Sequence, residues 1–419
     1  MLEVLFDVCC GLDVHSKSVV ACVLRGALSK HPERLTRTFV TTMQGLCALR
    51  EWLLELGCRE VAMESTGVYW RPVWNVLEGP EFHLWLANAR AVKHVPGRKT
   101  DVSDAEWMAK MLRSGLVVAS FVPPEPIRDL RDWTRYRVAA VQDATALRNH
   151  IQKVLEDTNV KVAECVSDLF GVSGRAMLAE LSKTDGKPEA ERIADLARGR
   201  LRKRIPELIE ALDGKLREHH RKLLRIDLAR LSELEQWIAE IEREIDALLQ
   251  PYQPKVELLK TVPGIQHTMA AVIIAETGGE MSVFPTADHL ASWAGLSPGS
   301  NESGGKKRTA RTRPGNRHLR SGLCEVSWAI AHTRNTYLGA TFWRLAGRIG
   351  KKKAVLAIAR KTIVAIHTML AENVTYAELG ADYRRRVDAQ RYERKLLEQV
   401  KSLGYDVVRR DQPADGQAI

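Results

Sequence analysis

Four carboxylates in the first quarter of the chain stand where carboxylates can do chemistry. Asp13 interrupts the apolar run Gly-Leu-Asp-Val, Glu64 ends the run Val-Ala-Met-Glu, and Asp101 and Asp104 stand three residues apart. A carboxylate in an apolar strand needs a partner, and residues at i and i+3 share one face of a helix. Four carboxylates in a small volume repel one another unless cations neutralise them. Because Mg²⁺ prefers oxygen ligands and bridges to phosphate, the set predicts a magnesium site that acts on a phosphate ester. The bland alternative for Asp101 is a helix cap.

A second reactive group lies far along the chain. Ser297, Ser300 and Ser303 stand in a segment rich in Gly, Ser and Pro that runs directly into basic residues. A serine hydroxyl attacks only when a base or metal activates it and cations stabilise the developing charge. The composition does not choose among these serines, and Ser-Gly-Gly is also typical of a turn.

The basic residues themselves are unevenly distributed. The chain carries 63 Lys and Arg against 52 Asp and Glu, and the segment 304–361 holds fifteen of the cations but a single acid, Glu325. Such a block predicts a polyanionic partner, the alternative being a solvated basic surface. With 45% hydrophobic and 27% charged residues, the composition excludes a disordered or fibrous chain. The sequence offers no uninterrupted apolar run of membrane length and no signal peptide, so we expect a cytoplasmic protein without a membrane span. Seven scattered cysteines without a CxxC pair are expected to be mostly buried apolar residues.

The elements around the four carboxylates predict the fold that positions them. We expect strands at Val8–Val14, 18–24, 36–42, Glu60–Glu64 and 82–86. Helices are expected at 44–56, from about Gly67, and from a Thr100 cap to about Ser114, before Gly115. Three strands and a helix, followed by two strand–helix pairs, is the order of a ribonuclease-H-like α/β fold, although other α/β folds share this coarse order. In that fold the first strand, the end of the fourth and the later helix converge on one edge.

The remainder of the chain is predicted to be helical. The turn sequence Val-Pro-Gly-Ile at 262–265 resembles a helix-hairpin-helix, in which backbone N–H groups face a DNA phosphate. The segment beyond Tyr376 is a charged tail. Before these, a heptad stripe predicts a coiled-coil helix that pairs with a partner helix, the alternative being packing within its own domain. Its members are Leu231, Leu234, Ile238, Ile241, Ile245 and Leu248.

With these motifs in hand, the chain resembles the DEDD transposases of insertion sequences, a family that includes the Piv-type DNA invertases and the bridge-RNA-guided recombinases. The resemblance covers Gly11 to about Leu370 and is carried by seven motifs. They are Gly-x-Asp-Val, Met-Glu-Ser-Thr-Gly, Lys-x-Asp-x-x-Asp-Ala, Val-Pro-Gly-Ile, Ala-Gly-Leu-x-Pro, Ser-Gly-Gly and Pro-Gly-Asn-Arg-His-Leu-Arg. It implies a RuvC-like DEDD domain over 1–125 and a helical, coiled-coil region over 126–254. A C-terminal transposase domain over 255–375 and a tail over 376–419 would follow.

The resemblance also implies roles. Asp13, Glu64, Asp101 and Asp104 would hold Mg²⁺, and the Ser-Gly-Gly motif selects Ser303 as the nucleophile that forms a covalent phosphoserine with DNA. A bridge RNA would guide the choice of donor and target DNA. Homodimers would assemble into a tetrameric synaptic complex in a prokaryotic cytoplasm, at the nucleoid when active. Phosphate contacts are expected from Lys306, Lys307, Arg308, Arg311, Arg313, Arg317 and Arg320.

Three alternatives remain open at this point. The chain could be a junction-resolving endonuclease of the same fold, in which a metal-activated water replaces the serine. It could be a DNA invertase of the same family, because transposition and inversion differ in the DNA sites rather than in the protein. It could also bind nucleic acid without catalysis, which would leave the four carboxylates without a purpose.

Overall fold

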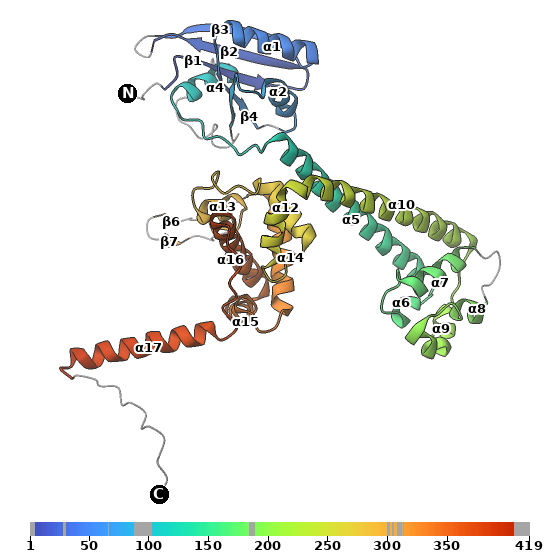
Figure 1. Ribbon diagram of the computed structural model, residues 1–419. Helices are drawn as coiled ribbons and strands as arrows, with labels where there is room; N and C mark the ends of the chain where they lie inside the picture. Colours follow the sequence, from blue (N-terminus) through green and yellow to red (C-terminus); the bar gives the residue numbers. More distant parts are fainter. Residues whose placement is uncertain are drawn as a thin grey trace. The chain divides into compact units, whose positions relative to one another are not determined.

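The computed structural model describes residues 5–27, 31–65, 67–87, 103–183, 189–299, 302–303, 306–307, 312 and 314–405 (Figure 1). The chain divides into two compact units, Met1–Val122 and Pro123–Ile419. The division falls close to the predicted boundary at residue 125. The predicted boundaries at 254 and 375 lie inside the second unit and stay predictions.

The first unit is a mixed five-stranded sheet. Strands β1 (Val8–Val14), β2 (Ser18–Arg25) and β3 (Glu33–Val40) are antiparallel. On the other side of β1, strands β4 (Glu60–Glu64) and β5 (His83–Ala87) run parallel, so that the order is β3-β2-β1-β4-β5. The predicted α/β class and element order are confirmed. The third strand begins earlier than predicted, because β3 pairs with β2 along its whole length, from Arg25↔Glu33 to Ser18↔Val40.

Helices cover both faces of this sheet. Helices α1 (Met43–Glu55) and α2 (Trp70–Leu77) pack on the face that carries Cys10 and Leu12 of β1. Helix α4 (Asp104–Arg113) packs on the opposite face, which carries Cys9. Alternation along a strand divides the side chains in this way. As predicted, most cysteines are buried: these two, Cys22 and Cys58, but not Cys47, Cys165 and Cys324.

The start of α4 corrects the prediction for its cap. The helix begins at Asp104, and its N-cap is Ser103, whose hydroxyl accepts a hydrogen bond from the Glu106 backbone N–H at 3.2 Å. A Ser followed three residues later by Glu is a capping-box pattern, so the sequence signal favoured Ser103 over Thr100. Asp101 therefore precedes the helix, and the predicted i, i+3 face shared with Asp104 is wrong. Asp101 itself lies outside the described residues.

The second unit opens with a long antiparallel helical hairpin, α5 (Glu125–Asp157) and α10 (Glu218–Leu249) (Figure 1). Its tip is built from α6 (Val162–Cys165), α7 (Val172–Lys183), α8 (Ala190–Ala194), η1 (Gly199–Arg204) and α9 (Ile205–Leu212). Ion pairs cross the hairpin, such as Arg137–Glu242 at 2.6 Å and Arg148–Glu235 at 2.8 Å.

The heptad stripe of α10 packs within this hairpin. Leu231, Ile241 and Ile245 are buried, and Leu234 and Ile238 are half-buried. The partner helix is α5 of the same chain, so the structure supports packing within the domain, the alternative reading of the stripe.

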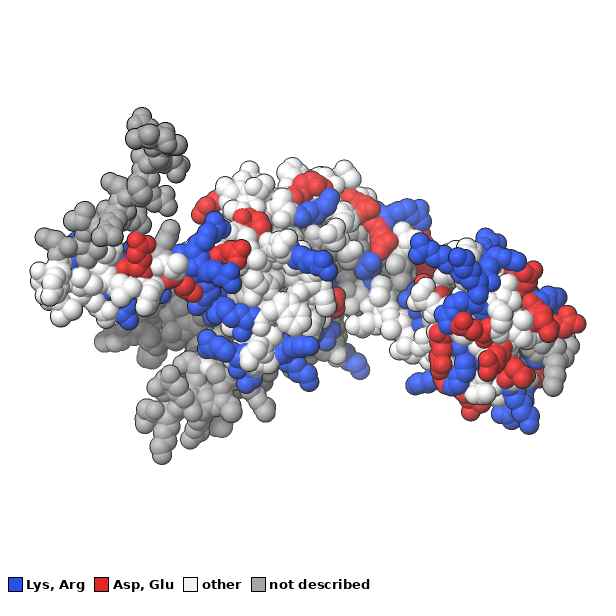
Figure 2. All heavy atoms as spheres, turned by 90° about the horizontal axis from the view of Figure 1, so that it is seen from below, with Lys and Arg blue, Asp and Glu red and all other residues white. Residues whose placement is uncertain are grey.

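A bundle of helices completes the second unit. After η2 (Gln250–Tyr252) come α11 (Gln253–Lys260), α12 (His267–Thr277) and α13 (Ala287–Trp293), and the short strands β6 (Glu302–Ser303) and β7 (Lys306–Lys307) follow. The last helices are α14 (Arg317–His332), α15 (Tyr337–Ile349), α16 (Lys351–Glu372) and α17 (Tyr383–Ser402). On the side where α15 lies, Lys and Arg side chains surround an uncharged area (Figure 2).

The predicted Val-Pro-Gly-Ile turn lies inside this bundle. The Val-Pro-Gly-Ile turn joins α11 to α12, with Gly264 at φ +81°, but a Cβ there would lie 3.1 Å from the Val326 carbonyl oxygen of α14. The glycine thus permits close packing of α14, and a phosphate contact at this turn stays a prediction.

Helix α16 is long and apolar enough to cross a membrane by length and composition. It packs against α13, α14 and α15, as a core helix of the bundle does.

Candidate active site

The paired strands β1 and β4 bring two of the predicted carboxylates together. Leu12 of β1 is opposite Met63 of β4, so the next residues in this parallel register are Asp13 and Glu64. Both lie on the face covered by α4, because Cys9 and Ala62, which have the same parity along their strands, pack there. Both side chains are half-buried. The sheet therefore presents two neighbouring carboxylates at the carboxyl ends of β1 and β4.

A glycine sets how closely α4 lies on this edge. A Cβ on Gly11 would stand 2.2 Å from the carbonyl oxygen of Ala105 and 2.3 Å from the backbone nitrogen of Ala109. Farther along, Arg113 at the end of α4 donates to the carbonyl oxygen of Asp7 at 3.1 Å. Helix α4 thus runs antiparallel to β1, and its first residue, Asp104, lies toward the end of the strand that carries Asp13. Three of the four predicted carboxylates share one face and one end of the sheet.

A histidine that the sequence analysis missed belongs to this edge. His15 Nε2 and a carboxylate oxygen of Asp13 form a hydrogen bond of 3.1 Å, and the imidazole is 61% exposed. The motif Gly-Leu-Asp-Val-His contains the signal, since residues two apart in an extended chain point to the same side. His15 orients the carboxylate of Asp13.

The donor chemistry of the carboxylates fits a hard divalent cation. Asp13, Glu64 and Asp104 supply only oxygen ligands, which Mg²⁺ prefers over the nitrogen and sulfur ligands of zinc sites. Within the described part of the chain, no three His, Cys, Asp or Glu side chains are close enough to hold an ion. The predicted fourth ligand, Asp101, lies outside that part. The ligand set stays a prediction, of which Asp13 and Glu64 are adjacent in the register of β1 and β4.

The predicted nucleophile lies in a small hairpin of the second unit. Ser303 of β6 pairs with Lys306 of β7, and Glu302 pairs with Lys307. Two residues, Gly304 and Gly305, connect the strands. Ser303, Lys306 and Lys307 are therefore neighbours on one ribbon. The predicted phosphate contacts Arg308, Arg311 and Arg313 lie outside the described residues, as does Ser300.

Two of the sequence motifs hold the ends of the serine segment together. Gly295, at φ +71°, belongs to the Ala-Gly-Leu motif, and a Cβ on Gly315 would lie 2.3 Å from its backbone nitrogen. Next to them, the Asn316 N–H donates to the Trp293 carbonyl oxygen at 3.0 Å. The Asn316 side chain also caps α14, accepting from the backbone N–H groups of His318 and Leu319 at 3.1 and 3.0 Å. The chain therefore leaves the bundle at Leu296 and returns to the same place.

A buried carboxylate, Glu276, lies where the two ends of the serine segment meet. The sequence analysis did not find it. Glu276 of α12 is fully buried and forms two hydrogen bonds of 2.8 Å with Arg135 of α5 and one of 2.6 Å with the Asn316 amide. Arg131 lies 3.5 Å from the same carboxylate. Burial acts to raise the pKa of Glu276, but the hydrogen bonds and charges of the arginines outweigh it and lower the pKa. Glu276 is thus an ionised link between α5, α12 and the start of α14.

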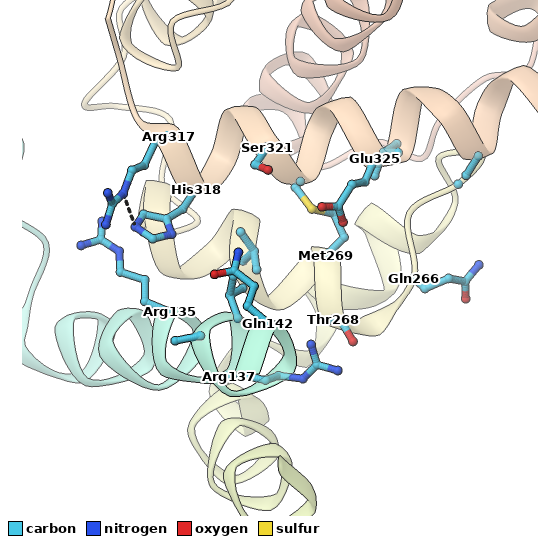
Figure 3. Close-up of a pocket in the computed structure, with 17 residues that line it drawn as sticks. Arg135, Arg137, Gln142, Gln266, Thr268, Met269, Arg317, His318, Ser321 and Glu325 are labelled. Atoms are coloured by element: carbon cyan, nitrogen blue, oxygen red, sulfur yellow. Dashed lines mark hydrogen bonds between the residues drawn. The ribbon is translucent and has the colours of Figure 1, made fainter. Parts of the chain in front are cut away.

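A cleft of about 810 Å³ opens beside this link, between α5, α12 and α14. Arg135, Arg317 and His318 lie together on one side of it, and Met269 and Glu325 lie on the other (Figure 3). Burial, with the charge of Arg135, lowers the pKa of His318, so that its ring is neutral at pH 7. Of the predicted phosphate contacts, Arg317 is exposed and Arg320 half-buried on α14.

Comparison with known proteins covers two stretches of the chain. A family model described as a DEDD transposase of the IS110 type matches residues 10–160, and one described as the transposase IS116/IS110/IS902 family matches residues 256–344. Together they cover more than half of the chain, and the first match contains all four predicted carboxylates while the second contains Ser303.

Three relatives illustrate the range of the similarity. The insertion element IS110 uncharacterized 43.6 kDa protein of Streptomyces coelicolor is 32% identical over 32% of this chain and 33% of its own length. The insertion element IS116 uncharacterized 44.8 kDa protein of Streptomyces clavuligerus is 29% identical over 69% of this chain and 78% of its own. The pilin gene-inverting protein of Moraxella bovis is 30% identical over 28% of this chain and 38% of its own.

The extent of these matches differs. The matched stretch spans about a third of the length of the IS110 protein and of an IS900 protein from Mycobacterium paratuberculosis. The IS116 protein instead matches across most of both chains. The paired carboxylates at the sheet edge and the two family models point to the same conclusion: the chain belongs to the IS110/IS116 family of DEDD transposases.

Proposed function

We propose that this chain cuts and rejoins DNA as a transposase or site-specific recombinase, in two steps of phosphoryl transfer through a covalent phosphoserine. The observation that carries the proposal is the register that sets Asp13 beside Glu64 on the face covered by α4. Such a pair of carboxylates is suited to a metal that orients a phosphate. The basic segment after Ser303 supplies the cations that a DNA backbone needs.

In this mechanism Asp13, Glu64, Asp101 and Asp104 would hold Mg²⁺, which would supply charge stabilisation at the scissile phosphate. Ser303 Oγ attacks the phosphorus, so that the Oγ–P bond forms while the P–O3′ bond breaks. Asp104, exposed at the first turn of α4, takes the hydroxyl proton, which passes on to the leaving 3′ oxygen. After strand exchange the 3′-hydroxyl of the other strand attacks the phosphoserine and releases Ser303.

The partners follow from this chemistry. Donor and target duplexes both have to be held, and we propose that a bridge RNA selects them while the cations from Lys306 to Arg320 contact phosphates. The acidic edge and Ser303 belong to different units of the chain. We propose that homodimers assembled into a tetramer bring them to one phosphate. The reaction would take place in a prokaryotic cytoplasm, at the nucleoid.

Trapping the covalent intermediate tests the serine. The purified protein, its bridge RNA, its DNA substrates and Mg²⁺ are incubated, and protein–DNA adducts that resist denaturation are separated on a gel. We expect Ser303→Ala to abolish the adduct and strand joining, whereas Ser297→Ala, in the same segment, retains both. Cutting by Ser303→Ala at the normal rate would instead identify a junction-resolving endonuclease that uses water.

A second candidate, inversion, rests on the similarity to the pilin gene-inverting protein. Substrates that carry two sites in inverted orientation on one plasmid distinguish it from transposition between separate plasmids. Both outcomes leave the phosphoserine chemistry intact.

A further inference from the structure

The α15–α16 corner, defined as Trp343, Arg344, Arg348, Lys351, Lys352 and Lys353, is a basic surface separate from the serine hairpin. From Val326 to Ala371 the sequence contains eight Lys and Arg and no Asp or Glu. All six residues of the corner are exposed, and Gly350 at φ +83° makes the turn between the two helices. The described part of this surface is therefore positive and faces solvent.

The two aspartates of a groove beside the corner are each paired with an arginine. A groove next to the corner is lined by Arg344 together with Asp382 and Asp388. Asp388 pairs with Arg384 at 3.1 Å and Asp382 with Arg385 at 3.9 Å. The cations of the corner thus have no carboxylate of this groove left to compensate them, and an external polyanion can do so.

Exposed aromatic rings lie within the same surface. Trp343 is 51% exposed and Trp328 is 41% exposed. Both rings pack on the buried Phe342: the ring centroid of Trp343 lies 5.3 Å from that of Phe342, and the ring centroid of Trp328 lies 5.6 Å from it. The Trp343 indole N–H donates to the Ala331 carbonyl oxygen at 2.9 Å, and the ammonium of Lys351 lies 5.6 Å from its ring centre. The indole is fixed in place while half of its surface stays open.

Proteins bind unpaired nucleotides by combining two features: cations that follow the nucleic-acid backbone, and fixed aromatic rings on which the bases stack. A duplex offers phosphates to such a surface but keeps its bases stacked inside, so it cannot use the rings. We propose that the α15–α16 corner binds a single-stranded segment of nucleic acid, with phosphates on its cations and a base stacked on Trp343. The proposal rests on the proposed function only in that the chain handles nucleic acid. Figure 2 shows the charge distribution on this side.

Equilibrium binding tests it without strand cleavage. The full-length protein is titrated, without Mg²⁺, into fluorescent single-stranded RNA, single-stranded DNA and duplex DNA of one mixed sequence. We expect Trp343→Ala to weaken single-strand binding about tenfold and to leave duplex binding unchanged. Trp343→Phe, which keeps an aromatic face and the contact with Phe342, restores most of the affinity. A difference between the RNA and DNA probes tells which strand the corner prefers.

The cations have their own readout. Changing Lys351, Lys352 and Lys353 together to Ala should reduce the slope of log affinity against log salt by about 2 for single strands. Matched controls are Lys153, Lys215 and Lys222, exposed on or beside the long helical hairpin, whose replacement by Ala removes the same charge. These controls should leave the slope unchanged.

Three results would overturn the proposal. One is wild-type affinity of Trp343→Ala for both single strands. Another is an equal loss on duplex and single strands, which would make the corner a duplex surface. The third is a change in the oligomeric state of Trp343→Ala without a change in binding, which would assign the rings to a protein interface. Because the assay is independent of Ser303, a failed adduct experiment leaves it unaffected.

Discussion

The acidic edge and the serine hairpin are positioned in different ways. Asp13 and Glu64 are neighbours because the backbone hydrogen bonds of β1 and β4 set their register, and a helix seated on Gly11 covers them. Ser303 stands on a two-residue strand of a ribbon whose ends are fixed to the bundle by Gly295, Gly315 and Asn316. The carboxylates thus belong to a sheet, whereas the serine belongs to a short ribbon that is held to the helical bundle at its two ends.

The largest effect is expected at the acidic edge itself. Asp13→Asn removes a charge of the proposed metal site without changing its shape, and we expect strand cleavage to fall about 1,000-fold, because the site supplies several kcal/mol of charge stabilisation. Cleavage of labelled DNA measures the rate, and a gel shift checks that binding persists.

Glu60 is the matched control for that change. It lies on the same face of β4 as Glu64 but at the opposite end, where it bonds His83 at 2.7 Å and Trp85 at 2.8 Å. We expect Glu60→Gln to cleave at close to the normal rate. An equal loss in both variants would mean that the sheet, and not the edge, was damaged.

The next largest effect concerns the base of the hairpin. Glu276→Gln removes the buried countercharge of the half-buried Arg135 and Arg131, and we expect the second unit to lose about 3 kcal/mol of unfolding free energy. Urea titration followed by circular dichroism measures it. Glu242→Gln, which breaks a pair with a 46% exposed carboxylate, should cost less than about 1 kcal/mol. Similar costs for both would contradict the anchoring role of Glu276.

A smaller effect is expected at Gly11. Ala in this position would bring its Cβ to 2.2 Å from a backbone oxygen of α4, so the helix must move, at a cost of about 1–3 kcal/mol. Because Asp104 moves with the helix, cleavage should fall as well. Gly347→Ala, on the exposed face of α15 where no atom lies within 4 Å, should stabilise the protein by about 0.5–1 kcal/mol.

The smallest effect is a pH dependence of the stability of the second unit, which arises from Glu276. The pKa of Glu276 is lower in the folded protein than its ordinary value of 4.5, so its ionised form stabilises the fold above pH 4.5. This stability is lost as the pH falls through the folded pKa. Thermal melts from pH 7 down to pH 3 should therefore show a steeper acid loss for the wild type than for Glu276→Gln. Parallel curves would contradict this assignment.

Local patterns predicted most of the sheet, because β1, β2, β4 and β5 are short runs made largely of apolar residues. Strand β3 is mostly polar and exposed, and its start was misplaced. The limits of β1 and β4, and hence the placement of Asp13 and Glu64, follow from these runs. The cap of α4 was misplaced because Thr100 and Ser103 are both good caps. The glutamate at position 106 distinguishes them, because it stands three residues after Ser103, as in a capping box.

The support of the serine hairpin could not be predicted from local patterns. Arg135 and Glu276 lie 141 residues apart, and the approach of Gly315 to Gly295 depends on how the bundle folds. A partial signal was present, since a glutamate directly after the apolar run Met269–Ala275 needs a partner when buried. The heptad stripe likewise predicted a partner helix but not that α5 of the same chain supplies it.

The meeting of Gly295 with Gly315 has a consequence for how the chain tolerates change. The two ends of the serine segment meet at one point of the bundle, so a change in the length between them need not disturb α13 or α14. Closing a somewhat longer loop costs little free energy. The serine segment can in this sense change in length, provided that Ser303 and its neighbouring cations are kept.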